Sequence, residues 1–400
     1  MTTTLSRTFA GLPTAEPEEI GLSRAGLKRL TAVMEREIAA GRAPGTAMLI
    51  ARNGKVGYAQ TLGALEPGGP AMPSDAIFRI YSMTKPIVSV AAMMLVEEGR
   101  MFLAEPLSKY IPAFAETKVG VENDAGLDLV PLKRPITIQD LMRHTSGLTY
   151  GFTGASPVQK LVATSRIGDQ EGTLREQTEA LAALPLKHQP NEVWEYSLST
   201  DVLGRVIEVI EGARLGEVLS ARIFEPLGMD DTAFFIPSAK LGREAKPMSP
   251  DVYANAGRNP DAATAPPRFE SGGGGLYSTI GDYARFLAML SGGGKLDGER
   301  ILGPRTITYM ASDHLGAHID RSDPLLTPGH GFGLGFGVRL QNGVVATTGS
   351  VGDYFWGGWA ATNFRISPQD SLFAIFMAQA PDYSDHFFWL FRNLYNAAIR

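Results

Sequence analysis

The chain has 400 residues, of which 44% are hydrophobic and 20% are charged, a composition typical of a globular protein with one large core or two domains. The net charge is −5 and no long basic run is present, so we expect neither nucleic acid nor a membrane surface as a partner. The absence of cysteine excludes disulfides, thiolate metal sites and a cysteine nucleophile. The first ten residues lack the apolar segment of a secretory signal, and no apolar run is as long as a membrane span, so a cytoplasmic location is the default expectation.

The first eighty residues predict a helix followed by antiparallel strands. Ser23 is a candidate N-cap for a helix with an apolar stripe, and Gly41 ends that helix. Strands are predicted over residues 46–52 and 55–62. Between them stands Asn53-Gly54, the strongest short signal for a β-hairpin.

The next stretch carries a chemically suggestive pair. Ser82 and Lys85 stand three residues apart before the mostly apolar run 87–96, which predicts a buried helix. Residues i and i+3 share a helix face, so the amine of Lys85 can reach the hydroxyl of Ser82. A lysine can activate a serine nucleophile when burial lowers its pKa. A chance Ser-x-x-Lys is expected about once in a chain of this length, but this is the only one in the chain and it precedes an apolar run.

Residues 81–290 are mostly helical in pattern, with one long loop. Residues 135–148 predict a short helix that runs into a turn, and longer helices are predicted over 173–184, 200–210, 215–224 and 280–290. Residues 237–267 are rich in proline, alanine and asparagine and read as a loop, which is usually functional or mobile at that length. The four glycines 272–275 lack the sequence of a phosphate-binding loop, so we interpret them as sites of close backbone packing.

The C-terminal part returns to strands. A hairpin is predicted from residues 335–340 to 344–348 around Asn342-Gly343, then strands over 360–366 and 371–378, and a closing helix over 386–399. The predicted fold class is α+β, with an antiparallel sheet flanked by N- and C-terminal helices and a mostly helical second domain. Residues 1–80 and 291–400 would form a discontinuous α/β domain, and residues 81–290 the helical domain.

Ser82 needs a proton acceptor and an oxyanion hole. Tyr196 lies just before a predicted helix, and a tyrosine near a lysine ammonium is a usable base, although a purely structural tyrosine is an equal alternative. Two glycines, Gly357-Gly358, stand between Trp356 and Trp359 at the start of the strand 360–366, where they would let an acyl group approach the backbone. The oxyanion hole would combine the backbone N–H groups of Ser82 and Trp359. A glycine bulge on an edge strand is the alternative interpretation.

Other hydrolytic sites are disfavoured. No G-x-S-x-G motif occurs, so the usual serine–histidine elbow is absent. His314 and His318 are four residues apart, but Leu315 replaces the glutamate of the H-E-x-x-H zinc motif. We therefore expect no metal and no cofactor.

These motifs, in this order, resemble the serine β-lactamase and penicillin-binding protein superfamily, in particular its class C β-lactamase branch and the family VIII carboxylesterases. The resemblance extends from about residue 17 to residue 399 and rests on residues 78–85, 141–148, 226–229 and 272–276. It implies that Ser82 is the acylated nucleophile and that Lys85 and Tyr196 form the general base pair. It also implies that Trp356-Gly357-Gly358 replaces the family's Lys-Thr-Gly box, and that the active site lies between the two domains.

Two departures from the family pattern bear on the substrate. The family's Tyr-x-Asn reads Tyr196-Ser197-Leu198, so an amide side chain is missing, and Trp356 replaces the lysine that would meet a β-lactam carboxylate. Losing a charged hydrogen bond of about 1.5–3 kcal/mol weakens anionic substrates by roughly one to two decades. The aromatic residues near the motifs would instead favour an apolar acyl or alcohol group; they are Tyr150, Phe152, Phe355, Trp356 and Trp359.

The resemblance therefore implies a carboxylesterase that acts on a small-molecule ester with a short acyl chain. Three alternatives stay open at this point. They are a β-lactamase or D-alanyl-D-alanine peptidase, an acyltransferase that uses the same acyl-enzyme, and a sensor that is acylated and does not turn over.

Overall fold

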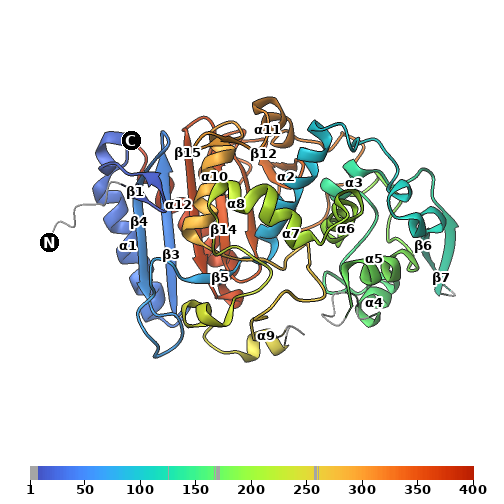
Figure 1. Ribbon diagram of the computed structural model, residues 1–400, viewed down its shortest axis with the longest axis horizontal. Coiled ribbons are helices and arrows are strands. Elements are labelled where there is room, and N and C mark those ends of the chain that lie inside the picture. The colour runs from blue at the N-terminus through green and yellow to red at the C-terminus, as the bar shows by residue number, and fades with distance from the viewer. Residues whose placement is uncertain (1–7, 125, 166, 168–171, 256–258, 260) are drawn as a thin grey trace.

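The computed structural model describes residues 8–124, 126–165, 167, 172–255, 259 and 261–400. Its main layer is a seven-stranded sheet in which every pairing is antiparallel (Figure 1). The strands in spatial order are β11 (His330–Phe332), β12 (Gly337–Arg339), β13 (Tyr354–Gly358), β14 (Thr362–Ser367), β15 (Leu372–Ala378), β3 (Gly45–Arg52) and β4 (Lys55–Gly63). The pairing of β15 with β3 joins the two ends of the chain in one sheet, which confirms the predicted α+β fold.

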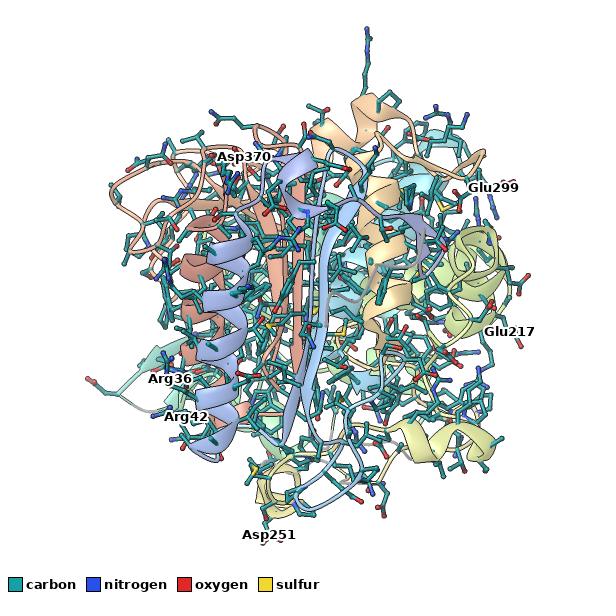
Figure 2. All side chains as sticks on the ribbon, turned by 90° about the vertical axis from the view of Figure 1, so that its left-hand side faces the viewer. Arg36, Arg42, Glu217, Asp251, Glu299 and Asp370 are labelled. Carbon is teal, nitrogen blue, oxygen red and sulfur yellow. The ribbon has the colours of Figure 1, made fainter. Side chains whose placement is uncertain are left out.

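Helices cover both faces of the sheet. Figure 2 shows the sheet edge-on, with α1 (Arg24–Ala39) and α12 (Ser384–Asn396) on one side and α10 (Ile280–Ser291) on the other. Ser23 caps α1 as predicted, because its hydroxyl accepts a hydrogen bond from the backbone N–H of Gly26 at 3.2 Å. The sheet is therefore the middle of three layers.

A second, mostly helical part of the chain contains α6, which contacts α2, α3 and α5. The remaining helices are α2 (Thr84–Glu97), α3 (Ile138–Met142), α4 (Pro157–Thr164), α5 (Leu174–Ala182), α6 (Ser199–Glu211), α7 (Leu215–Leu219), α8 (Glu225–Leu227), α9 (Asp251–Asn255) and α11 (Pro304–Met310). Short 3₁₀ helices are η1 (Pro17–Ile20), η2 (Tyr81–Met83), η3 (Leu107–Lys109), η4 (Pro112–Glu116), η6 (Ser238–Arg243) and η7 (Pro381–Tyr383), and η5 (Ser220–Phe224) is a π-helical turn. Small two-stranded sheets pair β1 (Thr8–Phe9) with β2 (Leu12–Pro13), β5 (Ile77–Arg79) with β8 (Tyr277–Thr279), β6 (Lys118–Asn123) with β7 (Gly126–Pro131), and β9 (Lys295–Leu296) with β10 (Glu299–Arg300).

The sequence analysis did not anticipate the hairpin β6–β7. The stretch 237–267, predicted as a loop, contains two short helices, η6 and α9. The division of the chain at residues 80 and 290 stays a prediction. α10 falls within the predicted helical domain but packs on β15 and β3 of the sheet. In the long loop over 237–267, residues 256–258 and 260 lie outside the described residues. No helix among the described residues combines the length and apolarity needed to cross a bilayer.

Two strand predictions near the C-terminus are wrong. Residues 344–348 form no strand, and β12 pairs instead with β11 and β13. Residues Tyr354–Gly358 do not open the strand that follows but form β13, which lies between β12 and β14, so the edge-strand alternative is wrong as well. The chain reverses between β13 and β14 through Ala361, whose φ is +67°, a left-handed conformation that alanine rarely adopts.

Gly358 lies where β13 passes the segment that leads to Ser82. A Cβ atom at this position would lie 2.2 Å from Thr362 Oγ1 and 2.3 Å from the carbonyl oxygen of Ile80. We predict that Gly358→Ala pushes β13 away from Ile80 and destabilises the fold by about 1–3 kcal/mol. The matched control is Gly357→Ala, whose Cβ would have its nearest contact at 3.2 Å. Thermal unfolding should show the larger loss for Gly358→Ala, and equal losses would contradict this explanation.

Candidate active site

Ser82 and Lys85 lie at the point where the chain turns into α2. Ser82 belongs to η2, and Lys85 lies in the first turn of α2, with its Nζ 3.3 Å from Ser82 Oγ. Tyr81, directly before Ser82, has a φ of +44°. Such a conformation costs a non-glycine residue about 1–3 kcal/mol and is found preferentially at functional sites. The helix itself is buried along nearly its whole length, as its apolar sequence predicts.

The ammonium group of Lys85 is held from three sides. Its side chain is 1% exposed, and Nζ lies 3.1 Å from Tyr150 Oη and 2.6 Å from the carbonyl oxygen of Gly273, in addition to Ser82 Oγ. A lysine ammonium has three N–H donors, so these three oxygens can satisfy all of them. The carbonyl and the phenol thus fix the direction in which Nζ faces Ser82.

The glycine-rich segment 272–275 makes the contact with Lys85 possible. A Cβ atom on Gly272 would lie 2.6 Å from the carbonyl oxygen of Thr200, and one on Gly273 would lie 2.3 Å from Asp201 Oδ2. The predicted close backbone packing is therefore right. The carboxylate of Asp201 holds the segment by accepting hydrogen bonds from Ser271 Oγ at 2.6 Å and from the backbone N–H of Gly273 at 3.0 Å. Burial raises the pKa of Asp201, and the nearby charge of Lys85 opposes that rise.

Tyr196 also contacts Ser82. Its hydroxyl donates a hydrogen bond to Ser82 Oγ at 2.6 Å, and Lys85 Nζ lies 4.5 Å from the centre of its ring. The backbone N–H of Tyr196 donates to Asp323 Oδ2 at 3.1 Å, which fixes the segment. The structure thus brings together Ser82, Lys85 and Tyr196, the three residues that the sequence analysis assigned to one site.

His144 packs against Tyr196 and was not identified from the sequence. Its ring is buried, 5.0 Å from the ring of Tyr196, and its Nδ1 lies 3.2 Å from Ser197 Oγ. Burial and the charge of Lys85 lower the pKa of His144 well below its usual value, so the imidazole is neutral. Asp201 was missed as well. His144 could have been found from its place in the family-like stretch 141–148. Asp201 could have been found from its position five residues after Tyr196.

Ser82 opens into a cavity of about 1280 Å³ whose walls come from both the helical part and the sheet. The predicted substrate-binding residues all line it, namely Tyr150, Phe152, Phe355, Trp356, Gly357 and Gly358. The indole of Trp356 lies 5.4 Å from the ring of Tyr196, and Phe152, which is 66% exposed, stacks on Tyr150 at 4.7 Å. The wall beside Ser82 is therefore aromatic.

The side chains of Phe355 and Trp359 do not lie beside that of Trp356. Successive side chains of a strand alternate between its faces, so Phe355 lies on the opposite face of β13, with its ring against His330 and Phe388. The ring of Trp359 lies 5.4 Å from that of Tyr81, the residue before Ser82. The substrate contact of Phe355 and the oxyanion role of the N–H groups of Ser82 and Trp359 stay predictions.

Tyr150 was expected only to line the pocket, but its hydroxyl also accepts a hydrogen bond from Lys85. We predict that Tyr150→Phe lowers kcat/KM for an ester about tenfold or more and leaves KM nearly unchanged. The ring keeps its stack on Phe152, while Lys85 loses one acceptor and a charged hydrogen bond of about 1.5–3 kcal/mol. Steady-state kinetics on p-nitrophenyl butyrate measure the effect. Phe152→Leu, which alters the aromatic wall without touching Lys85, should raise KM instead; an unchanged kcat/KM for Tyr150→Phe would contradict the prediction.

The sequence and the fold of this chain were compared with those of known proteins. Residues 30–392 match the beta-lactamase family. Protein Rv1367c of Mycobacterium tuberculosis (strain ATCC 25618 / H37Rv) is 37% identical over 330 residues, which are 79% of this chain and 80% of that protein. Esterase EstB of Burkholderia gladioli is 32% identical over 368 residues, 86% of this chain and 88% of EstB. The structure of EstCE1, a hydrolase with promiscuous acyltransferase activity, matches with a TM-score of 0.77 at 25% identity and covers 93% of this chain and 98% of its own. The chain thus belongs to the beta-lactamase family, as a serine hydrolase with esterase and acyltransferase relatives.

Proposed function

We propose that the protein is a carboxylesterase that cleaves short-chain acyl esters through an acyl-enzyme on Ser82. The observation that carries the proposal is the pair of contacts at Ser82 Oγ, 2.6 Å from Tyr196 Oη and 3.3 Å from Lys85 Nζ, inside an aromatic cavity. The similarity to EstB supports an ester as the substrate.

The proposed reaction has two halves. In the reactive form Tyr196 is a phenolate, whose negative charge the nearby Lys85 ammonium stabilises. Ser82 Oγ attacks the ester carbonyl carbon as its proton passes to that phenolate oxygen. As the bond to the alcohol breaks, the same proton goes to the leaving oxygen. In the second half Tyr196 takes a proton from water, the water oxygen attacks the acyl carbon, and Ser82 regains its proton as the acid leaves.

The aromatic wall bears on substrate choice. Trp356 stands in the place where the resemblance puts a lysine, so the cavity presents an indole rather than a cation at that point. A carboxylate on the substrate would be desolvated there without a charged partner, which disfavours β-lactams and favours neutral esters.

The decisive comparison is kcat/KM for p-nitrophenyl butyrate against nitrocefin on one preparation, with Ser82→Ala as the blank. We expect a strong preference for the ester. Parity, or a preference for nitrocefin, would overturn the carboxylesterase proposal in favour of a β-lactamase.

The substitution Trp356→Lys tests whether the missing cation at position 356 is what disfavours nitrocefin. We predict that it raises the nitrocefin to ester ratio of kcat/KM by about 10-fold or more, the value of a charged hydrogen bond. Trp356→Met serves as the control, because it removes the indole without adding a charge. If both variants change the ratio equally, the missing cation is not what excludes the β-lactam.

Acyl transfer is a second candidate, because EstCE1 combines hydrolysis with promiscuous acyltransferase activity. It would use the same acyl-enzyme, with an alcohol in place of water in the second half. Turnover of p-nitrophenyl butyrate in the presence of 1-butanol, followed by chromatography, separates the outcomes. Butyl butyrate as the main product at millimolar alcohol would favour a transferase, and butyrate alone a hydrolase.

A further inference from the structure

Three buried arginines form a cluster on the face of β13 opposite Trp356. Arg339 of β12, Arg365 of β14 and Arg392 of α12 are 2%, 3% and 3% exposed. Arg365 is the cross-strand neighbour of Phe355, so it lies on the face of the sheet opposite Trp356. Within the described part of the chain, Asp353 is the one carboxylate that forms an ion pair with any of them, at 3.1 Å from Arg365 Nη1. This arginine cluster therefore carries two more positive charges than negative ones.

The charges are close together. The position that a Cβ atom on Gly349 would occupy lies 2.5 Å from Arg365 Nη1, 3.0 Å from Arg339 Nη1 and 2.7 Å from Asp353 Oδ2. The guanidinium carbons of Arg365 and Arg392 lie 5.1 and 4.8 Å from the centre of the Phe355 ring. Burial and the charge of Arg365 lower the pKa of Arg392 well below its usual value. Buried like charges at such separations are costly unless a counter-charge accompanies them.

The cluster also contains hydrogen-bonding atoms that find no partner among the described residues. They are Nε and Nη2 of Arg365, Oδ1 of Asp353, Nε2 of His330 and Oη of Tyr395, all of them buried. Nε and Nη2 lie on one edge of the Arg365 guanidinium, and Nη1, on another, is taken by Asp353. Such an edge offers two parallel N–H groups, the geometry that binds two oxygens of one oxyanion.

We propose that the arginine cluster binds a small inorganic oxyanion, of the phosphate or sulfate type, through Nε and Nη2 of Arg365, with Arg392 as the second charge. The anion would balance the excess charge and use the free edge of Arg365. It would also secure the segment 344–348, since Thr347 already accepts hydrogen bonds from Arg339 Nη1 at 2.9 Å through its carbonyl oxygen and from Arg392 Nη1 at 3.2 Å through its hydroxyl. The site would support β13 from the side opposite the nucleophile.

The test is thermal unfolding of the full chain, titrated with inorganic phosphate while sodium chloride keeps the ionic strength constant. We expect Tm to rise with the logarithm of the phosphate concentration above Kd, by about 3 °C at a hundredfold excess over Kd. Arg365→Lys keeps the charge but lacks the two-donor edge, and the rise should be lost. Arg305→Met, which removes an exposed arginine, should keep it. Activity is not measured, so the outcome is independent of the esterase proposal.

The change in Tm of a second variant, Arg392→Met, is expected to differ between phosphate-free and phosphate-containing buffer. Without phosphate, Arg392→Met removes one of three crowded charges and should leave Tm equal or higher; in saturating phosphate it should lower Tm below that of the unchanged protein. A phosphate-independent Tm for the unchanged protein, or the same rise in Arg365→Lys, would overturn the proposal. If Arg365→Lys does not fold, the unchanged protein in phosphate against chloride alone decides it.

Discussion

Replacing Ser82 by alanine is expected to lower kcat/KM for p-nitrophenyl butyrate by about 10⁴-fold or more. Alanine has no oxygen with which to form the acyl bond, and neither Lys85 nor Tyr196 can substitute for it at that place. The side chain of Ser82 is only half buried and its loss leaves the packing of α2 intact, so the variant should unfold at nearly the same temperature.

Ser89→Ala is the matched control, since Ser89 is a buried serine on the same helix but is not among the residues that line the cavity. It should keep nearly all of the activity. Labelling with a fluorophosphonate gives an independent measurement, because mass spectrometry should find one adduct on the unchanged protein and none on Ser82→Ala. Full esterase activity in Ser82→Ala would exclude the acyl-enzyme.

The second large effect is expected for Tyr196→Phe, which should lower kcat by about 10²–10⁴-fold, the range of a lost general base. The variant removes the oxygen that lies 2.6 Å from Ser82 Oγ, while the ring keeps its contacts with His144 and Trp356. Circular dichroism and Tm should therefore be unchanged, so that the loss can be assigned to proton transfer.

Tyr58→Phe controls for the loss of a buried phenol, because Tyr58 Oη lies 3.0 Å from Thr31 Oγ1 in the layer between α1 and the sheet. It should leave kcat unaltered. If Tyr196→Phe retained more than a tenth of the activity, Lys85, 3.3 Å from the nucleophile, would have to act as the base without Tyr196.

The contacts of the site that could be predicted from the sequence are those between residues a few positions apart in the chain. Ser82 and Lys85 share a helix face, so their contact is dictated by three residues of separation. Tyr196 was an even choice between base and structural tyrosine from its position before a helix, and the family resemblance assigned it to the base pair. The other two acceptors around Lys85, Tyr150 and Gly273, are 65 and 188 positions away, and no local pattern indicates such contacts.

The same distinction explains the errors in the strands. Asn53-Gly54 forms the expected hairpin because both residues have positive φ, +55° and +73°, and two strands of matching length follow and precede them. Asn342-Gly343 carries the same signal, but β12 already has partners on both sides, β11 and β13, so the residues after the turn have no edge to join. Conversely, the turn between β13 and β14 uses Ala361 at a positive φ, and it carries no glycine or asparagine that would have revealed it.

The pairing of β3 with β15 also determines when the protein can become active during synthesis. Arg52 and Asp370, which are joined by a hydrogen bond, are 318 positions apart in the chain. Until β15 leaves the ribosome, the hairpin β3–β4 has an open edge, and contacts of such long separation form slowly. The helix that carries Ser82 is made early, but β13, which completes the cavity, is held in the sheet through β14 and β15. The cavity beside Ser82 is therefore incomplete until β13, β14 and β15 have been synthesised, late in translation.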